Sequence, residues 1–252
     1  MAGESTVSVC MATYNGERYV AHQLRSILDE LGPDDEVVIV DDSSTDGTLA
    51  AVEGVVDSRV RVIRQSSNRG YVRTFEAAMA AATKDVVFLA DQDDEWVRGR
   101  KRALLDALKT RSIAAGDLVL LGDDSPLTSP LSQRPWKLGP LPHGGSLGNE
   151  IRLLAGNAPY YGCAMALRRD ALALVLPFPD FLTESHDLWI ATIGNTARTL
   201  AHVRQPVLRR RLHSSNASAP RPRGVVKALQ SRWMLIRAWA EARRRARSAT
   251  QV

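Results

Sequence analysis

The sequence predicts an α/β protein whose mostly parallel, Rossmann-like central sheet is flanked by helices, and two observations lead to that prediction. Short apolar runs alternate with segments of helical periodicity through the first half of the chain, the pattern of parallel βαβ units. Three of the apolar runs end abruptly in polar side chains, at Tyr14-Asn15, Asp41-Asp42 and 91–94. Ligands of such folds bind at the carboxyl ends of the strands. We therefore expect one polar ligand site, made by three separate strand ends.

Each expected element follows from the local pattern. Strands are expected where short apolar runs stop at turn residues, and helices where apolar residues recur with a period of about 3.6. The expected strands are 7–12, 36–40, 60–63, 85–90, 117–121 and 161–167; the expected helices are 17–31, 71–82, 169–176, 183–193 and a basic helix from 221. Residues 122–148 are rich in Pro and Gly, which predicts a long loop.

Charge divides the chain into a body, residues 1–220, and a tail, residues 221–252. The tail holds nine basic residues and one acidic residue, so the body has a net charge of −3 within a total of +5. A basic tail alone gives salt-sensitive, unspecific affinity for nucleic acid, and an acidic body repels a phosphate backbone. No nucleic-acid-recognition motif is present, so no specific nucleic-acid partner is expected.

The sequence predicts a cytoplasmic location. No segment has the ~20 uninterrupted apolar residues that a membrane-spanning helix needs. The N-terminal residues lack the charged, apolar and small-residue regions of a secretory signal. Cys10 and Cys163 both lie within apolar stretches, so buried free thiols in a reducing compartment are favoured over a disulfide.

The acidic run Asp91-Gln92-Asp93-Asp94 predicts a metal site. Adjacent carboxylates repel one another unless water or a cation neutralises them, and hard oxygen ligands favour Mg²⁺ or Mn²⁺. Such an ion would stabilise charge on a diphosphate leaving group. The alternative is a solvated acidic turn, but the position directly after an apolar strand favours the metal site.

The second strand ends in Asp41-Asp42, which has two interpretations. Its carboxylates could accept hydrogen bonds from a pyrimidine N–H or from ribose hydroxyls. They could equally cap the following helix, and in isolation this second role is favoured. Tyr14 could stack on a base, although a tyrosine at a strand end usually only packs.

Four motifs, in their order and spacing, resemble those of glycosyltransferase family 2. They are Ala12-Thr13-Tyr14-Asn15-Gly16, Val40-Asp41-Asp42-Ser43-Ser44-Thr45-Asp46-Gly47-Thr48, Asn68-Arg69-Gly70 and Leu89-Ala90-Asp91-Gln92-Asp93-Asp94-Glu95-Trp96. The resemblance covers residues 7–105 and implies a GT-A fold, with a nucleotide-sugar half at about 1–115 and an acceptor half at about 116–220. The form Asp-Gln-Asp-Asp before Trp96 looks most like rhamnosyltransferase-like members of bacterial surface-polysaccharide pathways.

The resemblance also assigns roles to individual residues. It implies that the nucleotide sugar is bound by Ala12, Tyr14, Asn15, Asp41, Asp42, Asn68, Gly70, Asp91 and Gln92. It implies a metal bound by Asp91 and Asp93, with His213 of the run 209–216 as a further ligand. Glu184-Ser185-His186-Asp187 resembles the late acidic motif of the family, which makes Asp187 the catalytic base. A base there would deprotonate an acceptor hydroxyl; the alternative is an acid stabilised by a helix N-terminus.

The resulting expectation is an inverting, Mn²⁺- or Mg²⁺-dependent transfer of rhamnose or another deoxysugar or hexose. The donor would be a nucleoside-diphosphate sugar and the acceptor a glycan or lipid-linked glycan. One alternative is a nucleotidyltransferase that forms sugar nucleotides, which is disfavoured because no Gly-rich phosphate loop with a following Lys appears. Another alternative is a non-catalytic binding protein with a basic, anion-binding tail.

The tail predicts a basic amphipathic helix. Val225, Val226, Leu229, Trp233, Ile236 and Ala240 follow helical spacing, and arginines fill much of the rest. Such a helix with a tryptophan is typical of a membrane-surface element, which would place the protein on the inner face of the plasma membrane. The same pattern is also compatible with a helix that packs on the body, and the sequence leaves both interpretations open.

Overall fold

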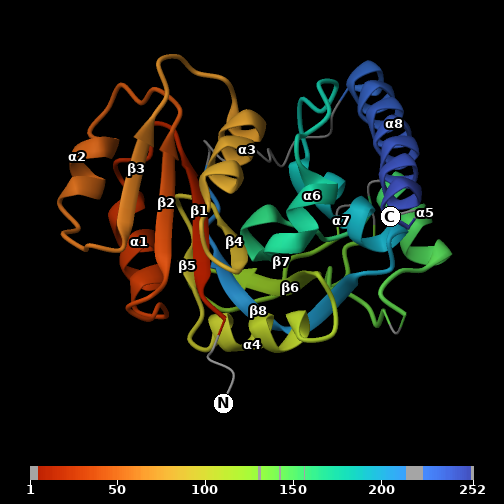
Figure 1. Ribbon diagram of the computed structural model, residues 1–252, viewed down its shortest axis with the longest axis horizontal. Helices are drawn as coiled ribbons and strands as arrows, with labels where there is room; N and C mark the ends of the chain where they lie inside the picture. Colours follow the sequence, from red (N-terminus) through yellow and green to blue (C-terminus); the bar gives the residue numbers. More distant parts are fainter. Residues whose placement is uncertain (1–4, 130–131, 142, 156, 214–223, 251–252) are drawn as a thin grey trace.

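The computed structural model describes residues 5–129, 132–141, 143–155, 157–213 and 224–250. Its centre is an eight-stranded sheet in the order β3-β2-β1-β4-β7-β6-β8-β5 (Figure 1). The strands are β1 (Val7–Thr13), β2 (Glu36–Asp41), β3 (Val60–Arg64), β4 (Val86–Ala90), β5 (Glu95–Trp96), β6 (Ile113–Leu120), β7 (Met165–Arg168) and β8 (Leu200–Arg210).

Eight α-helices accompany the sheet in the described part of the chain. They are α1 (Val20–Leu28), α2 (Thr48–Glu53), α3 (Tyr71–Ala81), α4 (Arg100–Leu108), α5 (Leu147–Leu154), α6 (Leu172–Val175), α7 (His186–Thr196) and α8 (Val225–Thr250). Two short 3₁₀ helices, η1 (Gly162–Ala164) and η2 (Arg169–Ala171), flank β7.

The strands β1 to β4 pair in parallel, as expected from their apolar runs. β7 is antiparallel to both β4 and β6, β6 and β8 are parallel, and β5 is antiparallel to β8. The sheet is therefore largely parallel, and β6 and β8 form its continuation beyond the antiparallel β7. Strands from both predicted halves of the body enter this one sheet, and the boundary between those halves stays a prediction.

Two buried cores cover opposite faces of the sheet. Alternate side chains of a strand point to opposite faces, and in β4 Phe88 enters one core while Leu89 enters the other. α1, α2 and α4 contribute to the core around Phe88, whereas α3, α6, α7 and α8 contribute to the core around Leu89. Cys10 and Cys163 are buried free thiols, as predicted.

Several expected boundaries are wrong. The expected strand 117–121 begins at Ile113, the expected helix 183–193 begins at His186, and the predicted loop 122–148 ends in α5, which begins at Leu147. The strand expected at 161–167 is divided into η1 and β7. The 11-residue strand β8 was not predicted. It lacks a continuous apolar run, because the middle residues 204–206 are Arg, Gln and Pro.

The basic tail is helical from Val225, and the predicted start at 221 lies outside the described residues. α8 packs beside α6 and α7 on the body (Figure 1). No helix of the described segments is both long enough and apolar enough to span a bilayer.

Candidate active site at the strand ends

The three polar strand ends meet at one edge of the sheet, as the sequence predicts. In the parallel register Thr13 of β1 lies opposite Asp41 of β2, and Met11 lies opposite Ala90 at the end of β4. The loops that follow these strands are therefore neighbours. This edge brings together the residues that the sequence assigns to the nucleotide sugar and to the metal.

Asp41 has a structural environment at this edge. Its side chain is fully buried. Its carboxylate accepts hydrogen bonds from the Thr13 hydroxyl at 3.0 Å and from the Ser44 backbone N–H at 2.9 Å. These bonds join the end of β1 to the turn after β2. The predicted contact with the nucleotide stays a prediction, and the structure shows that Asp41 also shapes the loop.

Asp42 fixes the third motif against the second. Its two carboxylate oxygens accept the backbone N–H groups of Arg69, at 2.7 Å, and Gly70, at 2.9 Å. Gly70 has φ of +80°, a conformation that glycine adopts without the steric cost of a Cβ. Asn68 accepts a second, longer bond from the Gly70 N–H at 3.2 Å. The loop at 68–70 is thus held beside the end of β2.

Gln92 joins the loop after β1 to the loop after β4. Its amide oxygen accepts the Tyr14 N–H at 2.9 Å, and its amide nitrogen donates to the Tyr14 carbonyl at 3.0 Å. A Cβ on Gly16 would lie 2.2 Å from the same amide oxygen, so a side chain at this position would displace Gln92. These two hydrogen bonds orient the backbone of Tyr14. The Tyr14 ring is exposed and available to stack on a flat ligand.

Asn15 completes the interlocked loops. Its backbone has φ of +46°, which asparagine tolerates better than most residues. Its side-chain oxygen accepts the Thr45 N–H at 2.9 Å, and its own N–H donates to the Ser44 hydroxyl at 3.0 Å. Ala12, which was also assigned to the nucleotide, lies in β1 and is partly buried.

Asp91 and Asp94 form a close acidic cluster beside Cys163. Ligand atoms of the three side chains lie within 4.8 Å of one another. Burial, reinforced by the neighbouring acidic charges, raises the pKa of both Asp91 and Asp94 above the ordinary value. One carboxylate oxygen of Asp94 is buried without a hydrogen-bond partner among the described residues. Unsatisfied buried oxygens of this kind are costly unless a cation neutralises them.

His213 lies against the same cluster. Its Nε2 atom is 2.7 Å from a carboxylate oxygen of Asp93, and its ring stacks on Tyr19 with 4.8 Å between centroids. The Arg211 N–H donates to Asp94 at 3.0 Å. The structure therefore brings three of the sequence-predicted groups together, and it adds Asp94, which the sequence-based metal assignment did not include.

The pairing of β5 with β8 explains this approach of distant segments. Glu95 lies opposite Arg209 in the antiparallel register, and the Arg209 guanidinium donates to Glu95 at 3.1 Å. Because the two strands are antiparallel, residues 211–213, which follow β8, lie beside residues 93–94, which precede β5. Because β8 was not predicted, this contact could be anticipated only through the motif resemblance.

The carboxylates of the acidic loop and the neighbouring His213 imidazole fit a hard divalent cation. Carboxylate oxygens with one imidazole nitrogen suit Mn²⁺ or Mg²⁺. The unpartnered oxygen of Asp94 supplies an available ligand atom. Burial raises the pKa of Cys163 well above its ordinary value, so its thiol stays protonated and does not suit a hard cation.

Two buried arginines lie beneath the acidic cluster, and sequence analysis missed both. Arg100, the first residue of α4, donates to the carbonyls of Leu89 at 3.1 Å and Cys163 at 2.6 Å. Burial lowers its pKa to about 10, so it remains a cation at neutral pH. Arg210 lies over the Tyr161 ring at 4.6 Å. These cations offset part of the acidic charge when no metal ion is bound.

Asp187 lies in the first turn of α7. Ser185, the residue before the helix, has φ of +59°, and the Asp187 carboxylate accepts the N–H of Leu188 at 2.8 Å. Burial raises the pKa of Asp187 to about 6. Arg210 acts electrostatically on Asp187 and also on Asp91 and Asp94, so one guanidinium links the two acidic groups.

His186 is a buried and neutral neighbour of Asp187. Its ring stacks on the Phe75 ring, with 4.4 Å between the centroids. It meets the Tyr71 ring edge-on and stacks on the Phe178 ring. Neither ring nitrogen has a hydrogen-bond partner in the described part of the chain. Burial lowers the pKa of His186 to about 3. The ring therefore acts as an uncharged packing element that supports the start of α7.

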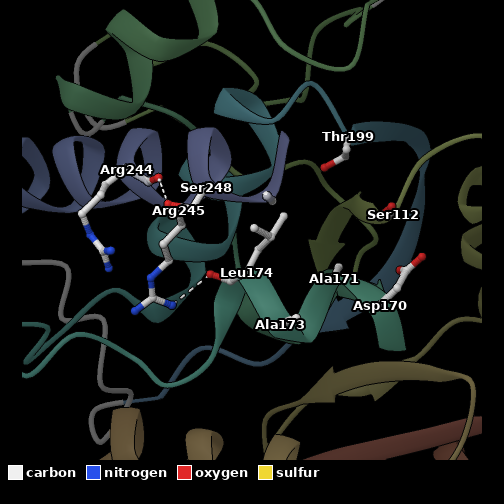
Figure 2. A pocket seen from close by; sticks show the side chains of 10 residues that line it. Ser112, Asp170, Ala171, Ala173, Leu174, Thr199, Arg244, Arg245 and Ser248 are labelled. Atoms are coloured by element: carbon white, nitrogen blue, oxygen red, sulfur yellow. Dashed lines mark hydrogen bonds between the residues drawn. The ribbon is translucent and has the colours of Figure 1, made fainter. Parts of the chain in front are cut away.

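A separate hollow of about 490 Å³ lies away from these residues, between α8, α6 and the starts of β6 and β8 (Figure 2). Ser112 and Thr199, which precede β6 and β8, line it together with Arg244 and Arg245. Arg245 donates to the carbonyl of Leu174 at 2.9 Å. Because the acidic cluster lies at the opposite end of β8, this hollow is distinct from the candidate site.

Comparison with known protein families identifies the family to which the motifs of this chain belong. The family model described as "Glycosyl transferase family 2" matches residues 8–175. TuaG of Bacillus subtilis, named for teichuronic acid biosynthesis, is 32% identical over 126 residues, which are 48% of this chain and 50% of that protein. The Escherichia coli protein WfaP is 27% identical over 107 residues, 42% of this chain and 43% of that protein. Its name describes a UDP-Glc:α-D-GlcNAc-diphosphoundecaprenol β-1,3-glucosyltransferase.

Solved structures share the fold. S. aureus TarS in complex with UDP-GlcNAc superposes with a TM-score of 0.66 at 20% identity, over 85% of this chain and 61% of that chain. The mannosyltransferase PcManGT from Pyrobaculum calidifontis, in complex with GDP-Man and Mn²⁺, gives a TM-score of 0.58 at 19% identity, over 100% of this chain and 76% of that chain. The expected GT-A fold is confirmed. The matched segments span half or less of the curated relatives named above.

Proposed function

The chain belongs to glycosyl transferase family 2, and from this premise we propose that it transfers a sugar from a nucleoside-diphosphate donor to a hydroxyl of a lipid-linked glycan, with inversion at the anomeric carbon. The donor sugar is a hexose or a deoxyhexose such as rhamnose. The product belongs to a bacterial surface polysaccharide. Relatives named for such pathways support the polysaccharide assignment, and the name of WfaP supports a diphospholipid-linked acceptor.

One observation carries the proposal: Asp93, Asp94 and His213 converge at the strand edge, and Arg210 acts electrostatically on both Asp94 and the buried Asp187. Asp91 and Asp94, whose ligand atoms lie within 4.8 Å of one another, would hold Mn²⁺ or Mg²⁺ together with the neighbouring pair of Asp93 and His213. When bound, such an ion would neutralise charge that develops on the diphosphate leaving group. The complex of PcManGT with GDP-Man and Mn²⁺ supports the choice of a divalent ion.

The residues of the chain account for the other steps. The Tyr14 ring stacks on the base, and the loops fixed by Asp41, Asp42 and Gln92 bind the ribose and the diphosphate. The Asp187 carboxylate accepts the proton of the acceptor hydroxyl as the oxygen bonds to the anomeric carbon. The bond from that carbon to the diphosphate oxygen breaks, and the nucleoside diphosphate leaves with the bonding electrons.

A donor-hydrolysis screen tests the proposal. Purified protein is incubated with UDP-, GDP- and dTDP-sugars, with and without Mn²⁺ or Mg²⁺, and release of the nucleoside diphosphate is measured. We expect metal-dependent release from at least one donor and its loss in the Asp93→Ala variant. The matched control is Glu53→Gln, which changes an exposed acid at the end of α2. Full activity of Asp93→Ala, or no release from any donor with either metal, would overturn the proposal.

A further inference from the structure

α8 has two opposite faces with different surroundings. Its inward face packs on the body through Ser231, Met234, Leu235, Ala238 and Ala242, all of which are buried. Its outward face carries four exposed apolar side chains: Val226 (70% exposed), Leu229 (65%), Trp233 (63%) and Ile236 (45%). With 3.6 residues per turn, these positions fall on one side of the helix, opposite Ala238. Packing on the body and an amphipathic surface are therefore properties of the same helix.

Exposed apolar side chains gathered on one face of a helix indicate a binding surface, whereas scattered ones are ordinary. Here the four side chains form a stripe over about three turns of α8. The inward face already binds the body, so the stripe is not needed for the fold. The helix α8 itself lies at the side of the molecule away from α2 (Figure 1).

The charges beside the stripe are basic. By helical spacing Arg232 lies on one side of it and Arg237 on the other, and both residues are exposed. Arg243, Arg244 and Arg247 continue the same outward face toward the C-terminal end. The acid of the described helix, Glu241, is paired with Arg244 and Arg245. The outward face therefore presents apolar and cationic groups with no free acid among its described residues.

These two properties decide the kind of partner. A second copy of this face would set arginines against arginines, which is electrostatically unfavourable. A nucleic acid would use the arginines but would leave the four apolar side chains in water. An anionic bilayer satisfies both groups, because apolar side chains enter the acyl boundary while arginines contact lipid phosphates. A tryptophan is well suited to this boundary, since its ring is apolar and its N–H is polar.

We propose that the outward face of α8, defined by Val226, Leu229, Trp233 and Ile236 with Arg232 and Arg243, docks the protein on an anionic lipid bilayer. Docking is a property of the surface and does not require catalysis. Its orientation has a consequence for acceptor delivery, and that consequence rests on the proposed function.

The docking helix is fastened to the segment that leads to Asp187. Ser231 donates a hydrogen bond to Glu184, and the Thr183 hydroxyl lies 4.0 Å from the Met234 sulfur. The Arg237 guanidinium lies 4.1 Å from the Phe181 ring centroid. α8 therefore contacts residues 181–184, directly before Asp187. A bilayer on its outward face would keep Asp187 at a fixed orientation to the membrane, so a glycan on a membrane lipid is the acceptor class that this placement serves.

Vesicle co-sedimentation of the full chain tests the docking surface. The vesicles contain phosphatidylcholine alone or phosphatidylcholine mixed with phosphatidylglycerol. We expect binding to the anionic vesicles and at least about tenfold weaker partitioning for the triple variant Leu229→Ser, Trp233→Ser and Ile236→Ser, since each loses buried apolar surface in the bilayer. The apolar control is Val56→Ser, which alters a 95% exposed side chain outside α8.

A charge-reversal pair separates the electrostatic part. Arg232→Glu with Arg243→Glu should lose binding to anionic vesicles by at least about tenfold. The matched control is Arg102→Glu with Lys109→Glu, which makes the same charge change at exposed positions on and just after α4. Circular dichroism and thermal melting confirm that each variant folds. Unchanged binding by either α8 variant, equal losses in the controls, or a stripe-dependent dimer in sedimentation equilibrium would overturn the proposal.

A second readout separates docking from catalysis. Donor hydrolysis in solution should stay unchanged in the α8 variants, whereas transfer to an acceptor embedded in anionic vesicles should fall. Loss of vesicle binding with retained hydrolysis supports docking. If no donor is hydrolysed but vesicle binding follows the stripe, the proposed function fails and the docking surface stands.

Discussion

His213 Nε2 lies 2.7 Å from a carboxylate oxygen of Asp93, although 120 residues separate the two side chains along the chain. The contact joins the C-terminal end of β8 to the acidic loop after β4. It places an imidazole on the acidic loop in which burial raises the pKa of Asp91 and Asp94. Three predictions follow from this site and its neighbours.

The contact between His213 and Asp93 predicts that both side chains bind the same metal ion. His213→Leu should weaken Mn²⁺ binding by at least about tenfold, because one nitrogen ligand and the orienting contact with Asp93 are lost. Isothermal titration calorimetry of the full chain measures the affinity. His22→Leu is the matched control, since His22 pairs with Glu95 at 2.9 Å but lies on α1. Equal Mn²⁺ affinity in the His213 variant and the unchanged protein would show that His213 is not a ligand.

Asp187 should set the acid limit of the reaction. Its pKa is raised by burial to about 6, and only the deprotonated carboxylate can accept a proton. kcat/KM should therefore be at half its limiting value at about pH 6 and fall up to tenfold per unit below that pH. Asp187→Asn should lower kcat by roughly 10²- to 10⁴-fold. Asp180→Asn, an exposed acid in the preceding loop, is the control; comparable losses in both variants would refute the assignment.

His186 should make the fold sensitive to acid. In the folded protein its pKa is lowered to about 3 by burial, against 6.5 in the unfolded chain. Between these values only the unfolded chain binds the proton, so the free energy of unfolding falls as the pH drops from 6.5 toward 3. His186 should therefore lower the free energy of unfolding by about 2 kcal/mol on going from neutral pH to about pH 5.

The variant His186→Leu removes that titration. Urea denaturation at about pH 7.5 and about pH 5 should show a drop in unfolding free energy that is about 2 kcal/mol smaller in the variant than in the unchanged protein. The comparison uses the difference between the two pH values, so a constant packing effect of leucine cancels. An identical pH dependence in the two proteins would contradict the neutral, buried state of His186.

The strand ends could be predicted because their pattern is local. A short apolar run followed by polar residues marks both the buried strand and its exposed end, as at Val40-Asp41 and Ala90-Asp91. The parallel register then brings these ends to one edge without further information. The resemblance to a family supplied Asp187 and His213, which no local pattern would have connected to the acidic loop.

β8 could not be predicted, because it is defined by its pairing with β6 and has no local apolar pattern of a strand. Its central residues are polar, and its register with β6 shifts on both sides of Asp117. Gly116 permits this packing, since a Cβ there would lie 2.4 Å from a methyl group of Val207. Without β8 the sequence gives no reason for Arg210 to lie under the acidic cluster, and a run of three arginines is more often solvated.

The tail shows the same division. Sequence periodicity predicted the apolar stripe of α8, and it left open whether that stripe packs on the body or faces outward. The structure shows that a different set of residues, including Leu235 and Ala238, makes the contact with the body. Both faces are partly apolar, so periodicity alone could not say which one the body covers.

The sequence by itself determined the βαβ order, the strand ends that carry polar groups and the basic amphipathic character of the tail, because each depends on residues close together in the chain. The tertiary structure alone decided which distant groups meet: His213 with Asp93, Arg210 with the carboxylates, and α8 with the segment before Asp187. The physical reason is that these contacts depend on strand pairing and on burial, and both arise only when remote segments pack against one another.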